Sequence, residues 1–362
     1  MTRSIIGVVG AGTMGAGIAQ LALENGHEVV LHDVDEAAVG RGRARIRDGL
    51  ARRAARLELD ADSIDEWVAG RLTGLRDAHT LDAVGAEAEI VIEAALEDLD
   101  LKRAIFRALD AASDREVILA TNTSALSVGS IAAATTRPER VIGLHFFNPA
   151  PVMALVEIVA TERTDPSVVD RATTLMAAWD KTPVRCADSP GFIVNRVNRS
   201  YTLEALRMLE ADVASVEAID AALGEGGFPL GPFELIDLTG VDINLAASRA
   251  IWDGLGRPER LRPSLLLERL IAEGRLGRKT GRGFYAYDDG RRGAVHPAFA
   301  GQATIIEPPA IRARILAAIG EEARLAVGEG VATANDIDLA MRLGAGHPSG
   351  PFERAAAPTI EP

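Results

Sequence analysis

Residues 4–37 read SIIGVVGAGTMGAGIAQLALENGHEVVLHDVDEA, and this stretch decides the fold. The run at 4–9 is rich in β-branched residues and predicts a strand, and the apolar segment after the glycine-rich turn predicts a helix. Asn25 and Gly26 predict the end of that helix. A second apolar run at 27–31 predicts the next strand. Strand, helix and strand in this order form a βαβ unit, which predicts a parallel sheet covered by helices.

The turn between the first strand and the helix has the spacing G-x-G-x-x-G, which binds the pyrophosphate of a dinucleotide at a helix N-terminus. We therefore expect cofactor contacts at Gly10, Ala11, Gly12, Thr13, Met14 and Gly15. Asp33 ends the second strand, where a carboxylate accepts hydrogen bonds from ribose hydroxyls. The next residues include Asp35 and Glu36, so a 2′-phosphate would meet like charge. The sequence therefore predicts NAD and not NADP as the cofactor.

The chain changes character after about residue 160, where the alternation of strands and helices ends. From about residue 190 to 285 it shows helical apolar spacing broken by Gly and Pro turns, which predicts a separate all-α domain. The expected segments are an α/β NAD-binding domain over 1–187, a helical substrate and dimerisation domain over 188–288, a linker over 289–309 and a partial repeat of the helical domain over 310–362.

The repeat is predicted from three motifs that return in the same order. These are Glu204-Ala205, Ile219-Asp220 and Gly231-Pro232-Phe233-Glu234, which recur as Glu322-Ala323, Ile337-Asp338 and Gly350-Pro351-Phe352-Glu353. Their spacing agrees to one residue, so the tail is interpreted as a truncated second copy of the first half of the helical domain. Ala313 stands where this alignment places Asn195, so we expect the tail to be structural and not a second active site.

Acidic residues outnumber basic ones, with 52 Asp and Glu against 39 Lys and Arg and a net charge of −13. Such a chain repels nucleic acid and anionic lipid unless basic residues gather locally. They do gather between Arg41 and Arg56, where seven arginines are opposed only by Asp48. Guanidinium groups match phosphate oxygens well, so this stretch is either a phosphate site or a solvated helix face.

Other features of the sequence exclude several classes of protein. No apolar run approaches the roughly 20 residues that a membrane span needs, and no leader precedes the first strand, so we expect no membrane association. Cys186 is the only cysteine, which excludes an internal disulfide and a Cys-rich zinc site. We expect no metal and a cytoplasmic location, because a reducing compartment fits this use of cysteine.

Two residues suggest acid–base chemistry. His145 lies at the C-terminal end of a predicted strand, where ligands gather in open α/β sheets. Glu157 stands alone within an aliphatic run, and a buried carboxylate is costly unless it has a partner. An imidazole is a suitable partner. From the pattern alone, a purely structural histidine is the alternative.

Seven motifs together resemble the L-3-hydroxyacyl-CoA dehydrogenase family over about residues 4–288. They are, in chain order, residues 10–15; Glu93-Ala94 with Glu97 and Lys102; residues 121–124; residues 145–149 with Glu157; and residues 189–196, 229–234 and 277–285. The resemblance implies a Rossmann-type NAD-binding domain followed by the family's all-α C-terminal domain. It also implies an activity like that of 3-hydroxybutyryl-CoA dehydrogenase and a homodimer formed through the helical domain.

The resemblance also implies roles for particular residues. The reaction would be the reversible oxidation of (S)-3-hydroxyacyl-CoA to 3-oxoacyl-CoA by NAD, with His145 as general acid and base and Glu157 as its support. Ser124 and Asn195 would lie around the 3-oxygen and the thioester carbonyl, with Asn195 contributed by the helical domain. Further NAD contacts are implied for Glu97, Lys102, Ser124, Asn148 and Lys279. The CoA phosphates are assigned to Arg52, Arg53 and Arg56.

The family often has a serine and a lysine on the CoA-binding helix, and here Gly49 and Arg56 take those positions, which puts the serine contact in doubt. Simpler interpretations stay open for single residues. Ser124 could cap a helix, Asn195 could be a surface amide, and Lys102 could pair with Asp98 one turn away.

Two other functions also fit the sequence. A sugar-acid dehydrogenase related to lens lambda-crystallin would have no phosphate to bind. A non-catalytic NAD- or CoA-binding subunit is a further alternative, although intact His145 and Glu157 speak against it.

Overall fold

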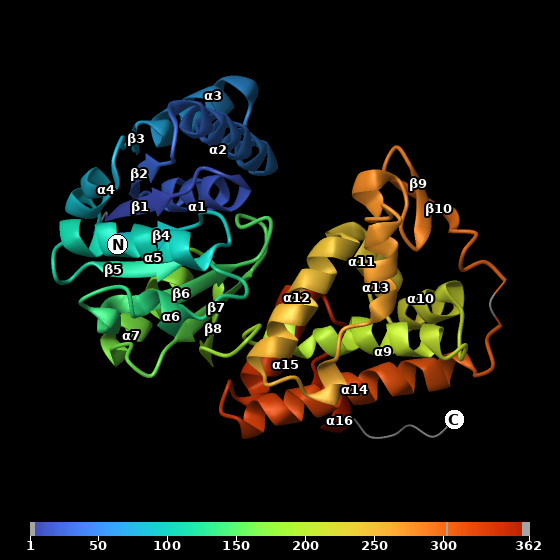
Figure 1. Cartoon of the computed structure of the whole chain (residues 1–362). Coiled ribbons are helices and arrows are strands. Elements are labelled where there is room, and N and C mark those ends of the chain that lie inside the picture. The colour runs from blue at the N-terminus through green and yellow to red at the C-terminus, as the bar shows by residue number, and fades with distance from the viewer. Residues whose placement is uncertain (1–3, 302, 357–362) are drawn as a thin grey trace. The chain divides into compact units, whose positions relative to one another are not determined.

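The computed structural model describes residues 4–301 and 303–356, which form two compact units that divide between Asp188 and Ser189 (Figure 1). The boundary expected after residue 187 lies one position earlier. The ends of the first and last expected segments, residues 1–3 and 357–362, lie outside the described residues. No helix in the described ranges is long and apolar enough to cross a lipid bilayer.

The described part of the first unit is built on a sheet of eight strands in the order β3-β2-β1-β4-β5-β6-β7-β8. The strands are β1 (Ile5–Val9), β2 (Glu28–His32), β3 (Leu75–Asp77), β4 (Ile90–Glu93), β5 (Ile118–Thr121), β6 (Val141–Phe146), β7 (Leu155–Ala160) and β8 (Thr182–Ala187). All neighbouring strands are parallel except β6 and β7. The central strands β4, β5 and β6 are buried along their whole length, as is typical of a parallel sheet covered on both faces.

Helices connect these strands. They are α1 (Thr13–Glu24), α2 (Glu36–Arg56), α3 (Ala61–Leu72), α4 (Leu81–Glu87), α5 (Leu99–Ala112), α6 (Val128–Ala132) and α7 (Pro166–Ala178), with a 3-10 turn at η1 (Pro138–Arg140). Side chains cap the starts of α2 and α5, because the Asp35 and Asp98 carboxylates accept from the N–H groups of Ala38 and Leu101.

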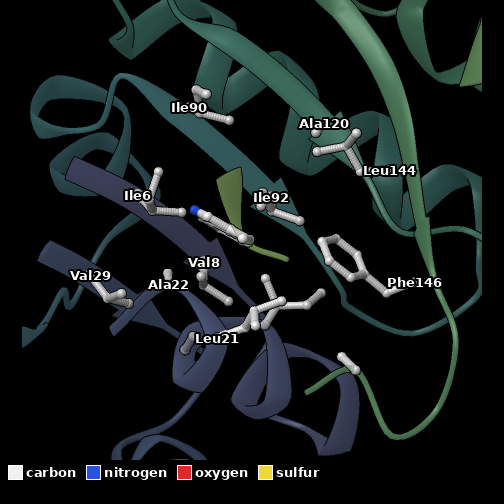
Figure 2. Close-up of a cluster of buried hydrophobic side chains, with 14 of the residues drawn as sticks. Ile6, Val8, Leu21, Ala22, Val29, Ile90, Ile92, Ala120, Leu144 and Phe146 are labelled. Atoms are coloured by element: carbon white, nitrogen blue, oxygen red, sulfur yellow. The ribbon is translucent and has the colours of Figure 1, made fainter. Parts of the chain in front are cut away.

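Figure 2 shows Ile6, Val8 and Leu21 in a cluster of buried side chains that also includes Ile92 and Phe146. Burying an aliphatic side chain of this size stabilises the fold by about 1.5–3 kcal/mol. Strands β1, β4 and β6 all contribute to this cluster. The carboxyl ends of these parallel strands, where the candidate site lies, therefore rest on a closely packed core.

The second unit is mostly helical. Its elements are α8 (Val194–Val197), α9 (Arg199–Glu210), α10 (Val216–Glu225), α11 (Pro232–Thr239), α12 (Val241–Gly254), η2 (Glu259–Leu261), α13 (Leu265–Ala272), η3 (Arg278–Thr280), β9 (Tyr285–Asp288), β10 (Arg291–Val295), α14 (Pro308–Gly328), α15 (Ala334–Ala345) and α16 (Pro351–Ala356). Strands β9 and β10 pair antiparallel.

This hairpin corrects two sequence expectations. The helical domain was predicted to be all-α, and residues 289–309 were predicted to be a linker, yet β10 lies inside that range. The reason is local: Asp289 and Gly290 both have positive φ, 44° and 70°, which is the backbone of a two-residue hairpin turn. The later part of this range is also attached to the helical domain, because the Ile305 N–H donates to the Val213 carbonyl.

Candidate active site

The glycine turn has the geometry of a dinucleotide cradle. Gly10 has φ +100°, and a methyl group there would lie 2.6 Å from the Ala94 carbonyl oxygen. A methyl group at Gly15 would lie 1.7 Å from the Gly10 carbonyl oxygen, so no larger residue fits either position. Gly12 faces open space and precedes α1 without a side-chain cap. The first N–H groups of α1 are therefore oriented as in known phosphate sites.

Asp33 lies at the end of β2, beside this turn. Its Oδ2 accepts from the Ala11 N–H at 2.6 Å, and its Oδ1 accepts from the Val34 N–H at 2.7 Å. A cavity of about 640 Å³ opens here, lined among others by Gly10, Gly12 and Asp33. A carboxylate has lone pairs beyond the two used by the backbone, so Asp33 can also accept from ribose hydroxyls. The turn, the open helix end and the cavity fit a dinucleotide.

A buried ion pair lies between β4 and α5. Lys102 is 1% exposed, and its ammonium donates to Glu93 Oε1 at 2.6 Å, with Glu93 0% exposed. The Thr121 hydroxyl donates to the second oxygen of Glu93 at 2.7 Å. The alternative pairing of Lys102 with Asp98 is wrong, because Lys102 is buried against Glu93 while Asp98 caps α5.

Glu97 organises the loop that follows β5. Its Oε1 accepts from the Thr123 hydroxyl at 2.6 Å, from the Ser124 N–H at 2.9 Å and from the Ala125 N–H at 3.1 Å. Burial alone would raise the pKa of Glu97, but the Thr123 hydrogen bond and the nearby Lys102 ammonium hold that pKa below its usual range. Glu97 is therefore a carboxylate at neutral pH.

The loop after β5 also shows whether Ser124 caps a helix. Helix α6 is capped by Ser127, whose hydroxyl accepts from the Ser130 N–H at 3.1 Å. The helix-cap interpretation of Ser124 is therefore wrong. Ser124 is exposed, and its hydroxyl lies 3.3 Å from Glu97 Oε1. It thus contacts Glu97, another implied NAD contact, at the carboxyl edge of the sheet.

His145 and Glu157 are directly opposite each other in the antiparallel register of β6 and β7. His145 Nδ1 lies 2.5 Å from Glu157 Oε2, with His145 6% and Glu157 0% exposed. A carboxylate only accepts hydrogen bonds, so Nδ1 carries the hydrogen, and in the neutral imidazole Nε2 then carries the lone pair. The Phe146 N–H donates to the Asn122 side chain at 2.9 Å, which fixes the end of β6 to the loop after β5.

The predicted phosphate-binding arginines also lie together. Arg52, Arg53 and Arg56 line a cavity of about 320 Å³ with Asn148 and with Gln20 of α1. Arg53 lies 3.9 Å from Glu24, whereas Arg52 and Arg56 make no ion pair within the part of the chain that the structure describes. This cavity carries excess positive charge, as a polyanion would require.

Gly49 stands on α2 where the family often has a serine. Gly49 is buried where α2 crosses α1, and a methyl group there would lie 1.9 Å from Gln20 Oε1. A side chain at this position would therefore have to displace the amide end of Gln20, which donates to Glu24 at 2.6 Å. The serine contact that the resemblance put in doubt has no counterpart at Gly49.

Two expected site residues belong to the second unit. Asn195 is half-buried in the short helix α8. Lys279 donates to both oxygens of Asp242, at 2.6 and 2.8 Å, and is about half-exposed. The structure of that unit alone therefore gives Lys279 an ion-pair role.

Sequence reasoning assigned no role to Glu93, Thr121 or Asn122. The signal at Glu93 was present, because a carboxylate ends the otherwise aliphatic strand IVIE in the same way that Glu157 interrupts LVEIVA. Asn122 carries no comparable signal, since an asparagine after a strand is usual in turns.

A glycine turn open to a dinucleotide, together with a histidine–carboxylate pair at the carboxyl edge of the same parallel sheet, is the arrangement of nicotinamide-dependent dehydrogenases. Comparison with known families gives the same class. Residues 5–189 match "3-hydroxyacyl-CoA dehydrogenase, NAD binding domain", and residues 191–287 and 311–357 match "3-hydroxyacyl-CoA dehydrogenase, C-terminal domain". The chain belongs to the 3-hydroxyacyl-CoA dehydrogenase family and is an NAD-dependent oxidoreductase.

Individual relatives agree with this assignment. The chain is 45% identical over 291 residues to a 3-hydroxyadipyl-CoA dehydrogenase of Escherichia coli. The aligned part covers 80% of this chain but only 60% of that protein. It is 41% identical over 288 residues to human mitochondrial hydroxyacyl-coenzyme A dehydrogenase, covering 77% of this chain and 90% of the human protein. A crystal structure of 3-hydroxybutyryl-CoA dehydrogenase from E. coli superposes with a TM-score of 0.89 at 36% identity, over 98% and 92% of the two chains.

Proposed function

We propose that the protein oxidises the 3-hydroxyl of an (S)-3-hydroxyacyl-CoA to a 3-oxo group with NAD, and that the reaction is reversible. The observation that carries this proposal is the buried pair of His145 and Glu157 at the carboxyl end of β6. The pair supplies a base whose tautomer is fixed, and the family assignment supplies the class of substrate.

His145 acts as the general base in the oxidation. Its Nε2 takes the proton of the 3-hydroxyl while the C3 hydrogen leaves with its electron pair, which gives the ketone and a protonated imidazole. Glu157 holds the ring through Nδ1 and stabilises the positive charge that forms. In the reverse direction the imidazolium returns the proton to the oxygen, so the same pair serves as general acid.

NAD, when bound, supplies the acceptor for the hydride. The turn from Gly10 to Gly15 would hold its pyrophosphate, and Asp33 would accept from its ribose hydroxyls. Glu97, Lys102, Ser124, Asn148 and Lys279 are the further cofactor contacts in this proposal. The cluster of Glu93, Lys102 and Glu97 keeps the loop after β5 in place for this task.

Arg52, Arg53 and Arg56 bind the phosphates of coenzyme A in this proposal. Three guanidinium groups around one cavity provide the charge that a polyanionic substrate needs on an acidic protein. The thioester and the 3-oxygen would be contacted by Asn195 and Ser124. The acyl chain is four carbons long or ends in a second carboxylate, since relatives named for 3-hydroxybutyryl-CoA and 3-hydroxyadipyl-CoA are both similar to this chain. The reaction would take place in the cytoplasm.

The test measures NADH formation from (S)-3-hydroxybutyryl-CoA and (S)-3-hydroxyadipyl-CoA. His145→Gln should lower kcat by about 100-fold or more while the Kd for NAD is kept, and Glu157→Gln should lower it less. His296→Gln, on the hairpin side of the second unit, is the matched control and should leave kcat unchanged. Full activity of His145→Gln would overturn the assignment of the base.

The arginines are tested with two substrates that share the acyl group. Changing Arg52, Arg53 and Arg56 together to Gln should raise KM for 3-hydroxybutyryl-CoA by at least about tenfold, because the loss of even one charge-assisted hydrogen bond costs about 1.5 kcal/mol. KM for the N-acetylcysteamine thioester, which has no phosphate, should not change. Turnover of a sugar acid without turnover of either thioester would favour the sugar-acid dehydrogenase, and no turnover by the isolated chain would favour a binding subunit.

A further inference from the structure

Two segments of the second unit match each other at a shift of 118 positions, which becomes 119 after a one-residue insertion in the second segment. Glu204 and Asp220 recur 118 positions later as Glu322 and Asp338. The local geometry recurs with them. Asp220 accepts from the N–H groups of Phe233 and Glu234 at 3.0 and 3.1 Å, and Asp338 accepts from those of Phe352 and Glu353 at 2.8 and 3.0 Å. Sequence and hydrogen bonding therefore both indicate that the tail is a second copy.

The two copies contact each other reciprocally. Arg196 Nε donates to Glu322 Oε1 at 2.7 Å, and the equivalent Arg314 Nε donates to the equivalent Glu204 Oε1 at 2.5 Å. A methyl group at Gly227 would touch Pro348, and one at the equivalent Gly346 would touch the equivalent Pro229. Phe228 packs edge-on against its own counterpart His347, with ring centroids 4.8 Å apart.

In a twofold interface between identical subunits, each contact occurs twice, with the roles of the two subunits exchanged. The contacts between the two segments follow this pattern. Here both halves of that interface belong to one chain. Helix α14 of the tail lies along α9 of the first copy, as Figure 1 shows. The tail therefore occupies the place that a second copy of the first segment would take.

The interface is symmetric in position but not in burial. The Arg196 side chain is 0% exposed, and it donates to both Glu322 and Glu329, each at 2.7 Å. The side chain of its counterpart Arg314 is 43% exposed. Glu322 is 1% exposed and also accepts from Arg260 at 2.7 Å. Arg196 of the first copy is therefore buried and paired with two carboxylates of the tail, whereas Arg314 of the tail is partly exposed where it pairs with the first copy.

This asymmetry coincides with a difference in sequence. The residue before Arg196 is Asn195, whereas the residue before Arg314 is Ala313. Arg196 and Asn195 are neighbours in α8, a helix of four residues, so a displacement of Arg196 also moves Asn195. Two carboxylates from the tail therefore hold the helix that carries Asn195, whose side-chain amide is the proposed substrate contact.

We propose that Glu322 and Glu329 are positioning residues, which orient Asn195 for the reaction by holding Arg196. The role of Asn195 itself rests on the proposed function. In this proposal the tail supplies the carboxylates that hold Arg196, while its own equivalent of Asn195 is Ala313.

The test compares symmetry-related variants in the full chain. Glu322→Ala should lower kcat with the acyl-CoA by about 10-fold to 100-fold, as expected for a misplaced contact group, and leave the Kd for NAD unchanged. Glu204→Ala removes the equivalent contact beside Ala313 and should change kcat less than twofold. Equal effects of the two variants on kcat would overturn the proposal. Glu329→Gln, whose side chain is 46% exposed, should fold normally and give a smaller loss in the same direction.

A double-mutant cycle separates this proposal from the proposed function. Asn195→Ala should lower kcat, and adding Glu322→Ala should then cause little further loss, because the positioned group is already absent. A full additional loss in the double variant would overturn the positioning role. An unchanged kcat in Asn195→Ala alone would instead refute the role of Asn195 in the proposed function.

Discussion

The buried ion pair between α5 and β4 gives a sharp prediction about stability. Lys102→Met leaves the Glu93 carboxylate, which is 0% exposed, without the ammonium that lies 2.6 Å away. Removing one partner of a buried pair costs about 3–5 kcal/mol, because the remaining charge is uncompensated. Glu93 keeps hydrogen bonds from the Thr121 hydroxyl and the Ala95 N–H, so we expect the lower end, about 3 kcal/mol.

The assay is urea unfolding followed by tryptophan fluorescence. Trp252 is the only tryptophan of the second unit, so a Trp252→Phe background makes Trp67 and Trp179 report on the first unit alone. Arg43→Met is the matched control. It removes an ion pair with Asp77 at 2.7 Å whose side chains are 39% and 37% exposed, and should cost about 1 kcal/mol or less.

A second variant checks the cause. Glu93→Gln combined with Lys102→Met removes both charges and should recover at least about half of the lost free energy of unfolding, because no buried charge is left unpaired. If Lys102→Met cost no more than Arg43→Met, the reasoning from burial would be refuted. The same would follow if the double variant were less stable than Lys102→Met alone.

Three further predictions concern single positions. Gly15→Ala should weaken NAD binding by about tenfold or more in calorimetry, because the methyl group would lie 1.7 Å from the Gly10 carbonyl oxygen and the turn must shift. Gly49→Ser, which restores the family's serine, should destabilise the first unit by about 1 kcal/mol in urea unfolding, since its Cβ would displace the Gln20 amide, which donates to Glu24. Burial lowers the pKa of His347 from 6.5 to about 3, so the unfolded chain binds a proton first as the pH falls below 6.5. Wild type should therefore lose about 2 kcal/mol of stability by about pH 5 through this group, and His347→Phe should not, as unfolding at about pH 8 and pH 5 will show.

The parts of the fold that the sequence predicts are those with strong local signals. β1, the glycine turn and α1 follow from apolar periodicity and turn residues, and His145 with Glu157 follows from a charge inside an aliphatic run. β3 (Leu75–Asp77) lies at the sheet edge with one buried residue, so it has almost no apolar signal. The hairpin of β9 and β10 depends on the Asp289–Gly290 turn, which resembles a linker because β10 is mostly exposed.

Other features depend on residues that are far apart in the chain. The contact at Gly49 comes from the Gln20 side chain on another helix, and nothing within α2 indicates it. The pair of Arg196 and Glu322 joins positions 126 residues apart. The recurring motifs can be seen in the sequence, but the way in which the two segments contact each other could not be predicted, because motif spacing carries no information on which faces meet.

The docked tail bears on the homodimer that the resemblance implies through the helical domain. The face of the first copy that includes Arg196, Phe228 and Pro229 is already covered by the tail, with buried charges paired and rings in contact. A second chain could use this face only by displacing the tail and leaving Arg196 buried without its carboxylates, which is costly. A homodimer that leaves the tail in place would therefore form through another surface. Because a contact within one chain does not weaken on dilution, α8 should be held in place at any protein concentration, and the specific activity should stay constant down to the lowest concentration at which it can be measured.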